Sequence, residues 1–370
     1  RFSMSKAAEL AALIGSQSSL ANRNMIINGN MAVHQRAATD THNDSAVDRY
    51  TLVKNNLDQA DFTTKHQIIT DNPPFSDALE IKCTTVEDAV ASNELIRVRM
   101  RLEANTLQKL QYGSASAKNS TLCFWVKSNL TDTFSVGLTT QDGTSQNIGF
   151  TYTIAQANTW QKVVWNVPAN ANGTINNDNG NGMMLVWGLT VGSGFRGTAN
   201  TTWANNTDAR NLNGHTANIA SSTDNNFYLT GVQWELGDVA QPFEHESFGD
   251  NLAKCQRYYF KCGLAANTFI GGAGWARDNN TFHVSCPYPV TMREAPTALE
   301  TSGTPSHYEV NYKALSAAVS SGPNFDSANS FGGFVSGDVS GTPLTAGESV
   351  RLVGSSGGGT GSFLAWSAEL

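Results

Sequence analysis

The sequence predicts a mainly β protein, built as an antiparallel β-sandwich with a short N-terminal helix and a small β-rich C-terminal domain. Three observations predict this fold class. Only 15% of the 370 residues are charged, against about 25% in typical soluble domains. Gly, Asn, Ser and Thr fill the gap, and turns between strands use these residues heavily. Short segments of alternating apolar and polar residues recur along the chain.

Residues 5–14 predict the N-terminal helix. They are strong helix formers, and Ala7, Leu10, Leu13 and Ile14 recur at three- and four-residue spacing. A helix of about a dozen residues is marginal alone in water, so its apolar stripe needs a partner. That partner is the same helix of another copy, a neighbouring protein, or its own domain. We assign residues 1–21 to attachment or trimerisation.

Residues 22–246 predict the sandwich. The clearest strand runs from Ile96 to Leu102, where four apolar residues alternate with Arg97, Arg99 and Arg101. A period of two places the apolar groups on one face and the three guanidiniums on the other. Three like charges on one face must be solvated or paired across an interface. Further strands are predicted at residues 25–33, 49–53, 78–83, 121–127, 134–139, 148–154, 161–167, 183–191 and 227–235.

The C-terminal third follows a predicted connecting helix at residues 247–262, based on helical spacing of apolar residues over 248–260. Residues 263–370 then predict a β-rich tip domain, rich in Gly, Ser and Ala. Apolar residues there are too sparse to bury much in one chain, which favours an oligomer whose copies cover one another. Its strand-like segments are residues 281–286, 308–312, 331–335, 349–352 and 362–370.

Charge and composition argue against several classes of partner. A net charge of −7 without a long basic run gives no footprint for nucleic acid. No apolar stretch reaches 18 residues, so we expect no membrane insertion, and the start of the chain does not resemble a signal peptide. The five cysteines are scattered without C-x-x-C spacing, which predicts free thiols in a chain assembled in a cytosol.

The motifs of catalysis and metal binding are missing from the sequence. It has no H-E-x-x-H, no G-x-S-x-G and no phosphate loop, so we expect no cofactor, no metal and no catalytic residues. The weak metal candidates are the run Glu244-His245-Glu246 beside Asp250, and Asn28, Asn30 and Asp48 for calcium. Glu103 and Glu235 are carboxylates on predicted strands, but nothing in the sequence pairs them as a glycosidase requires.

Saccharide binding has better support. Sugars are held by aromatic rings and by planar polar groups on a rigid surface. The long stretch from residue 192 to 226 has little periodicity, which is typical of a functional or mobile loop. Its Trp203 lies outside any apolar pattern, so we predict an exposed platform, with anchoring of the loop onto the sandwich as the alternative. The other predicted carbohydrate-binding residues are Arg196, Asn205, Asn206 and Asp208.

Several motifs occur in the order found in a known family. The block NRNMIINGNM at residues 22–31, followed by Gln35-Arg36 and VDRY at 47–50, resembles the start of a sandwich domain common in bacteriophage tail-fibre proteins. Further blocks agree: TLCFWVKS at 121–128, Trp160, LTGVQWELG at 229–237, PFE at 242–244, CQRYY at 255–259 and MREAPT at 292–297. The resemblance implies a carbohydrate-binding-module-like jelly roll in a virion structural protein that commonly forms trimers, without catalytic residues.

These observations together predict a homotrimeric phage tail fibre or related virion appendage, assembled in the host cytoplasm. Its N-terminal region would contact other virion proteins, and its C-terminal region a host-surface polysaccharide. Two alternatives stay open. A capsid-decorating or purely structural virion protein would share the fold without binding glycans, and a polysaccharide-degrading tailspike would cleave them.

Overall fold

The computed structural model describes residues 22–36, 39–40, 46–72, 74–87, 89–197, 201–210, 212–263, 273–355 and 361–370. The predicted N-terminal helix lies outside these residues. The chain divides into two compact units, Arg1–Phe248 with Leu370, and Gly249–Glu369. We refer to them as the sandwich and the C-terminal unit, and each is described by itself.

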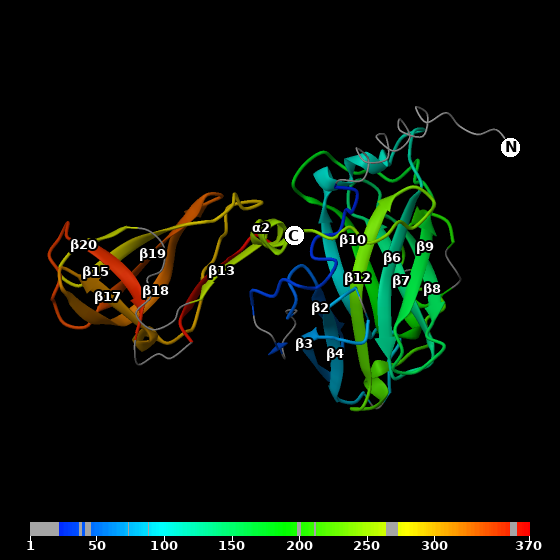
Figure 1. The fold of residues 1–370 in the computed structure, drawn as a ribbon, viewed down its shortest axis with the longest axis horizontal. Coiled ribbons are helices and arrows are strands. Elements are labelled where there is room, and N and C mark those ends of the chain that lie inside the picture. The colour runs from blue at the N-terminus through cyan, green and yellow to red at the C-terminus, as the bar shows by residue number, and fades with distance from the viewer. Residues whose placement is uncertain are drawn as a thin grey trace. The chain divides into compact units, whose positions relative to one another are not determined.

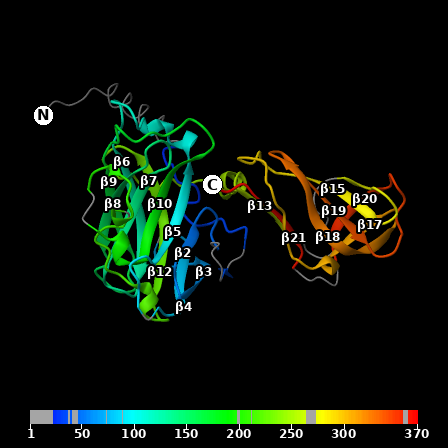
Figure 2. The ribbon, with the colours of Figure 1, turned by 180° about the vertical axis from the view of Figure 1, so that it is seen from behind.

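The sandwich consists, over its described residues, of two six-stranded antiparallel sheets (Figures 1 and 2). Sheet A contains, in spatial order, β1 (Thr39–Asp40), β3 (Asp61–Ile68), β4 (Asp77–Thr85), β12 (Asn226–Leu236), β6 (Ser120–Ser128) and β9 (Gln161–Val167). Sheet B contains β11 (Ala204–Asn205), β8 (Gln146–Thr153), β7 (Thr133–Thr140), β10 (Asn181–Val191), β5 (Leu95–Glu103) and β2 (Thr51–Asn55).

The strand pairing makes this unit a jelly roll. Four antiparallel pairs are nested along the chain: β7 with β8, β6 with β9, β5 with β10, and β4 with β12. Successive pairs alternate between the two sheets, as in the double Greek key of jelly rolls. The predicted fold class, a mainly β protein with an antiparallel jelly-roll sandwich, is confirmed for the described residues.

The alternating pattern between residues 96 and 102 is confirmed as the centre of β5. Its apolar residues are buried and its three arginines lie on the other face. The predicted strand at residues 25–33 is wrong. Asn28 and Met31 have positive φ angles of 57° and 62°, so this segment turns where a strand would continue straight. The sequence also gave no sign of β3, whose residues mix Thr, Lys, His and Gln.

The N-terminal segment instead lies along β12 and contacts the block at residues 229–237. The amide of Met25 donates to the carbonyl of Trp234, and that of Val232 to the carbonyl of Gly29. A Cβ on Gly29 would lie 2.1 Å from the Val232 carbonyl oxygen, so only glycine fits. Arg23 forms an ion pair with buried Glu235 at 3.0 Å.

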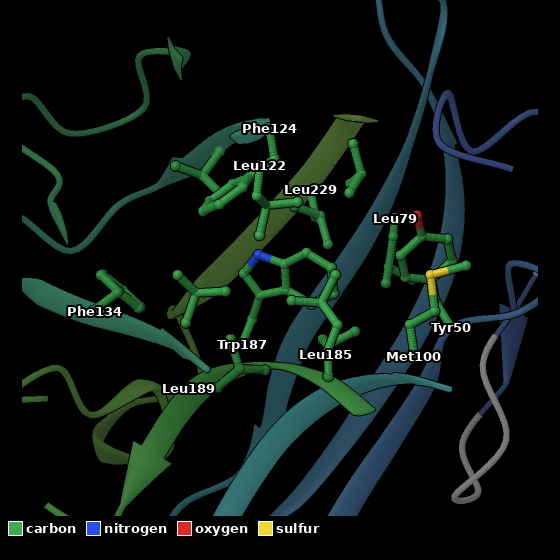
Figure 3. Packing of buried hydrophobic residues seen from close by; sticks show 14 of the residues in the cluster. Tyr50, Leu79, Met100, Leu122, Phe124, Phe134, Leu185, Trp187, Leu189 and Leu229 are labelled. Carbon is green, nitrogen blue, oxygen red and sulfur yellow. The ribbon is translucent and has the colours of Figure 1, made fainter. Parts of the chain in front are cut away.

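A continuous apolar core fills the space between the sheets, and Trp187 on β10 lies near its centre (Figure 3). Its ring meets Phe124 of sheet A edge-on, with ring centroids 5.8 Å apart, and Tyr50 lies at 6.1 Å. Burying a side chain of this size contributes about 1.5–3 kcal/mol. Trp165 is also buried, whereas Trp125 is only partly buried and packs against a smaller cluster around Phe75.

The C-terminal unit begins with α2 (Phe248–Gln256) and contains a three-stranded sheet and a closed barrel. The sheet is formed by β13 (Tyr259–Gly263), β21 (Phe363–Ser367) and β16 (Glu300–Thr301). The barrel is formed by β14 (Gly274–Ala276), β15 (Thr281–Pro287), β19 (Gly332–Val339), β18 (Leu315–Asn329), β17 (Tyr308–Tyr312) and β20 (Ser349–Gly354), with β14 and β20 paired to close it.

Two predictions for this unit need correction. The connecting helix is shorter than residues 247–262, because Tyr259–Gly263 forms β13 and pairs with β21. The prediction that one chain buries little here is wrong. The C-terminal unit has its own core, in which Phe282 and Tyr308 of the barrel and Trp366 of the three-stranded sheet are completely buried. Closing a sheet into a barrel encloses the few apolar residues available, so a sparse composition is sufficient.

Two further properties concern the whole described chain. None of the five cysteines, all of which lie in described positions, forms a disulfide bond. Among the described helices, none has the length and apolar character that crossing a bilayer requires.

His215 makes the stability of the sandwich depend on pH. It is buried, its Nε2 donates to the carbonyl of Ala217 at 2.8 Å, and its Nδ1 lies 3.0 Å from the Ser135 hydroxyl. Burial lowers the pKa of His215 to about 4 from its ordinary 6.5. The unfolded chain therefore binds a proton that the folded chain does not, between these two values.

We expect the free energy of unfolding to be highest above pH 6.5 and to fall by about 3 kcal/mol from this group between pH 6.5 and 4. Denaturant titrations at pH 7, 5.5 and 4.5 measure this slope. His215→Gln should remove most of it, whereas the same change at exposed His34 should not. An unchanged slope in His215→Gln would mean that other groups cause the loss.

Candidate functional site

An exposed patch of aromatic side chains lies on the outside of the C-terminal barrel. Trp275 is 43% exposed, Phe334 36% and Phe331 68%. Scattered exposed apolar residues are ordinary on a protein surface, but contiguous ones mark binding sites. We call Trp275, His283, Phe334, Phe331 and Asp326 the aromatic patch.

Strand alternation places these residues on the outer surface. On β15, Phe282 and Val284 point into the barrel core, so His283 between them points outward. On β19, the buried residues Gly333 and Val335 flank Phe334 in the same way. The register pairs Trp275 with His283 across β14 and β15, and His283 with Ser336 on β19.

Three of the four rings of the patch, those of Trp275, His283 and Phe334, are in contact. The indole of Trp275 stacks on the imidazole of His283, with centroids 5.4 Å apart and planes 12° apart. Phe334 meets Trp275 edge-on at 6.0 Å. One face of the indole is therefore covered by His283, and the exposed part of the ring is held in place by two neighbours. Such support limits the entropy that the ring would lose when a ligand binds.

Polar groups border the rings. Nδ1 of His283 lies 3.2 Å from the carboxylate of Asp326, and the buried Nε2 of His283 has no hydrogen-bond partner. The carboxylate of Asp326 is partly exposed, so its second oxygen can accept a further hydrogen bond. A planar carboxylate next to an exposed ring matches the alternating hydroxyl and C–H surfaces of a sugar.

A shallow pocket of about 250 Å³ adjoins the patch at Phe334 and Phe331. Its wall includes the amide of Asn329 and the backbone of Gly332 and Gly333. The Asn329 side-chain oxygen accepts hydrogen bonds from the amides of Phe331 and Gly332. This leaves the amide group of Asn329 as a donor beside the two phenylalanine rings.

Trp203, predicted as an exposed platform, is an anchor of the long loop. It is half-buried against the sandwich core, and its ring meets Tyr112 edge-on at 5.7 Å. Its indole nitrogen donates to the carbonyl of Pro168 at 2.8 Å. The alternative reading, in which Trp203 holds the loop on the sandwich, therefore describes its contacts.

The other four predicted carbohydrate-binding residues of the loop lie at the surface. Arg196, Asn205, Asn206 and Asp208 are all exposed. Asn206 accepts from the amide of Asn147 on β8, and Arg196 reaches the carbonyl of His215. The loop packs on the outer face of sheet B through Phe195, next to a small buried cluster. The role of these residues in carbohydrate binding stays a prediction.

The weak metal and carboxylate candidates have structural partners. Glu244 accepts from the amide of Asn24, and the side-chain amide of Asn28 donates to two carbonyls, including that of Asp48. Glu235 is buried in its ion pair with Arg23, and Glu103 accepts from Asn105. Over the described residues, no group of three or more His, Cys, Asp and Glu side chains is arranged to hold a metal ion.

Sequence reasoning missed the aromatic patch, although part of its signal was present. The predicted strands at residues 281–286 and 331–335 place His283 and Phe334 opposite their buried neighbours. An aromatic residue on the outward side of an alternating strand is therefore recognisable before the structure is known. Trp275 was not recognisable in this way, because β14 has only three residues.

The fold and the aromatic patch together define the structural class of the protein. The chain is a mainly β protein with a jelly-roll sandwich and a closed barrel that presents an exposed aromatic surface. No family model matches the chain, and no curated protein matches it.

Solved structures similar to the chain include a phage tailspike and carbohydrate-binding modules. The enzymatically active domain of tailspike protein 4 from bacteriophage CBA120 has 12% identity and a TM-score of 0.31 over 58% of this chain, which spans only 21% of that protein. A putative sugar binding protein from Bacteroides thetaiotaomicron has the same identity and TM-score over 58% of this chain and 100% of its own. The module TmCBM61, in complex with β-1,4-galactotriose, has 8% identity and a TM-score of 0.26 over 59% and 99%.

The two tryptophans should differ in their effect on stability. Trp203→Ala removes a half-buried ring and leaves the Pro168 carbonyl without its donor, so we expect a loss of about 2–3 kcal/mol from the sandwich. Trp275→Ala changes a largely exposed ring and should cost less than about 1 kcal/mol. Calorimetric unfolding of both variants measures the difference. Equal losses would contradict the assignment of one ring as an anchor and the other as a surface group.

Proposed function

We propose that this chain is a non-enzymatic glycan-binding protein whose aromatic patch binds a polysaccharide. The observation that carries the proposal is the exposed indole of Trp275, held between His283 and Phe334 with Asp326 beside it. A pyranose ring presents an apolar C–H face to such an indole and directs its hydroxyls toward neighbouring polar groups.

The binding step needs little rearrangement. The rings already contact one another on the rigid wall of a closed barrel, so the site is largely formed before the ligand arrives. The carboxylate of Asp326 would accept a sugar hydroxyl, and the adjoining pocket at Phe331 would receive the next sugar unit. Several weak contacts along a repeating polymer add to a useful affinity through multivalency.

The finer proposal is a homotrimeric phage tail fibre or related virion appendage that recognises a host-surface polysaccharide. It is supported by the ordered motif blocks that resemble tail-fibre proteins. Two of these blocks, residues 22–31 and 229–237, contact each other through backbone hydrogen bonds. In this role the N-terminal region contacts other virion proteins and the C-terminal unit contacts the host. A head-decorating or purely structural virion protein would have the same fold without the affinity.

Binding to an array of bacterial surface polysaccharides tests the function. We expect Trp275→Ala to lower affinity for the bound polysaccharide at least tenfold, because the stacking surface is lost. Leu315→Ala is the matched control, since Leu315 is a 60% exposed apolar residue of the same unit outside the patch. A wild-type chain that binds no polysaccharide, or an unaffected Trp275→Ala variant, would contradict the proposal. Release of reducing ends from the polysaccharide would contradict its non-enzymatic part.

The mass of the assembly tests the trimer separately. Multi-angle light scattering of the purified chain over a hundredfold range of concentration should give three times the mass of one chain. Exposed apolar side chains outside the aromatic patch provide contact surface for other copies: Ile68, Val164 and Val239. A monomer at all concentrations would exclude the homotrimer while leaving glycan binding intact.

A further inference from the structure

The outer face of sheet B holds two guanidiniums that the proposed function does not use. Arg97 and Arg99 lie two residues apart on β5, between β2 and β10 (Figure 2). We call them the arginine pair. Thr51 and Val186 are the strand partners of Arg99, and Val53 and Gly188 those of Arg97. None of these four neighbours carries a charge, so the strands beside the pair supply no counter-ion.

Neither member of the arginine pair forms an ion pair or donates a hydrogen bond to a described residue. Asp208, on the surface loop, lies close enough to favour the charged form of Arg97 without a direct contact. The next arginine on the same face, Arg101, already has an acceptor, because it donates to the main-chain oxygen of Leu370. The guanidiniums of the pair therefore lie close to one another and to Arg101, and they have unused donors.

This arrangement costs free energy when the face is empty. Burial lowers the pKa of Arg99 to about 10, with repulsion from Arg101 and Arg97 adding to the shift. Burial lowers the pKa of Arg97 as well, again with repulsion from Arg101. Both side chains are only partly exposed, so water compensates the charges incompletely. An anion at this position would relieve both the desolvation and the repulsion.

Buried polar atoms at the same face also lack partners. The Nε of Arg97 is buried without an acceptor, and the side-chain oxygen of Asn55 on β2 is buried without a donor. Asn55 is the strand partner of Leu95, two residues before Arg97 on the same face. Cross-strand diagonal neighbours lie about 7–8 Å apart at Cα, within reach of long side chains. The face thus combines two cations, an unused N–H and an unused acceptor.

We propose that the arginine pair binds the carboxylate of an acidic sugar, with a hydroxyl of the same sugar donating to Asn55. Guanidiniums bind carboxylates through paired N–H···O bonds, which fix the orientation of the group. An anion without O–H groups, such as chloride or sulfate, would satisfy the two cations and leave the acceptor of Asn55 without a donor. A uronic acid satisfies all three, because it carries a carboxylate and hydroxyl donors on one ring.

This site lies in the sandwich, whereas the aromatic patch lies in the C-terminal unit. The inference therefore adds a second subsite, specific for acidic sugars. It rests on the proposed function only in assuming that the ligand is part of a polysaccharide, and it does not require the aromatic patch. Failure of one site leaves the other intact, which allows the two to be tested apart.

The test uses the full chain and two uronate oligosaccharides, tetragalacturonate and a hyaluronan tetrasaccharide, with methyl-esterified tetragalacturonate as the uncharged match. Calorimetric titration should show binding of at least one acidic probe, no binding of the ester, and weakening as NaCl rises from 20 to 200 mM. Arg97→Gln and Arg99→Gln should each lower affinity at least tenfold. Arg277→Gln is the charge-matched control, since Arg277 is an exposed arginine of the other unit.

A second readout guards against misfolding. Without ligand, Arg99→Gln should have an unfolding temperature equal to or above that of the wild type, because the substitution removes repulsion. Trp275→Ala should retain the acidic sugar, since its ring belongs to the other unit. Three outcomes would overturn the proposal: neither acidic probe binds, inorganic phosphate competes at equal concentration, or Arg99→Gln alters the mass of the assembly. The last outcome would make the arginine pair an interface between copies.

Discussion

The sandwich depends on the insertion of β12 between β4 and β6. This strand comes last in the unit but occupies the middle of sheet A, so the sheet stays divided until residues 226–236 arrive. At Gly231 the strand leaves β4, with a φ of 60° and no room for a Cβ beside Phe75 and Trp125. Its second half is covered by residues 24–29. The first described segment of the sandwich and its last strand are thereby paired with each other. Such pairing between distant parts of the chain makes folding slow.

Strand alternation connects this scaffold to both proposed sites. The same period of two that buries Val98 in the core places Arg97 and Arg99, both partly exposed, on the outer face of sheet B, and the same period on β15 places His283 on the outside of the barrel. Each site consists of side chains that point away from the core. The register of the neighbouring strands sets the spacing of these side chains. The barrel offers rings for apolar sugar faces, and the sandwich offers cations for acidic groups. Under the two proposals, one chain recognises two chemical features of a polysaccharide.

Much of the fold was predictable because it depends on local pattern. The alternation through Arg97 and Arg99 identifies β5 without any structure, and the low charge identifies the β class. The long strand β18 was not predictable, since its bulges shift the register at three places and destroy the period. Anchoring by Trp203 was one of two readings of the sequence, but its partners could not be named, because Pro168 and Tyr112 are far away in the sequence. The aromatic patch was predictable only for the members that lie on long alternating strands.

The closure of the barrel has one more consequence. A strand at the edge of an open sheet offers unpaired N–H and C=O groups to any passing chain, and proteins aggregate or exchange strands through such edges. In the barrel β14 pairs with β20, and the ring of strands has no terminus. The outer surface of the barrel therefore offers side chains and no main-chain template. Substitutions on it change the side chains that it presents without creating an unpaired strand edge.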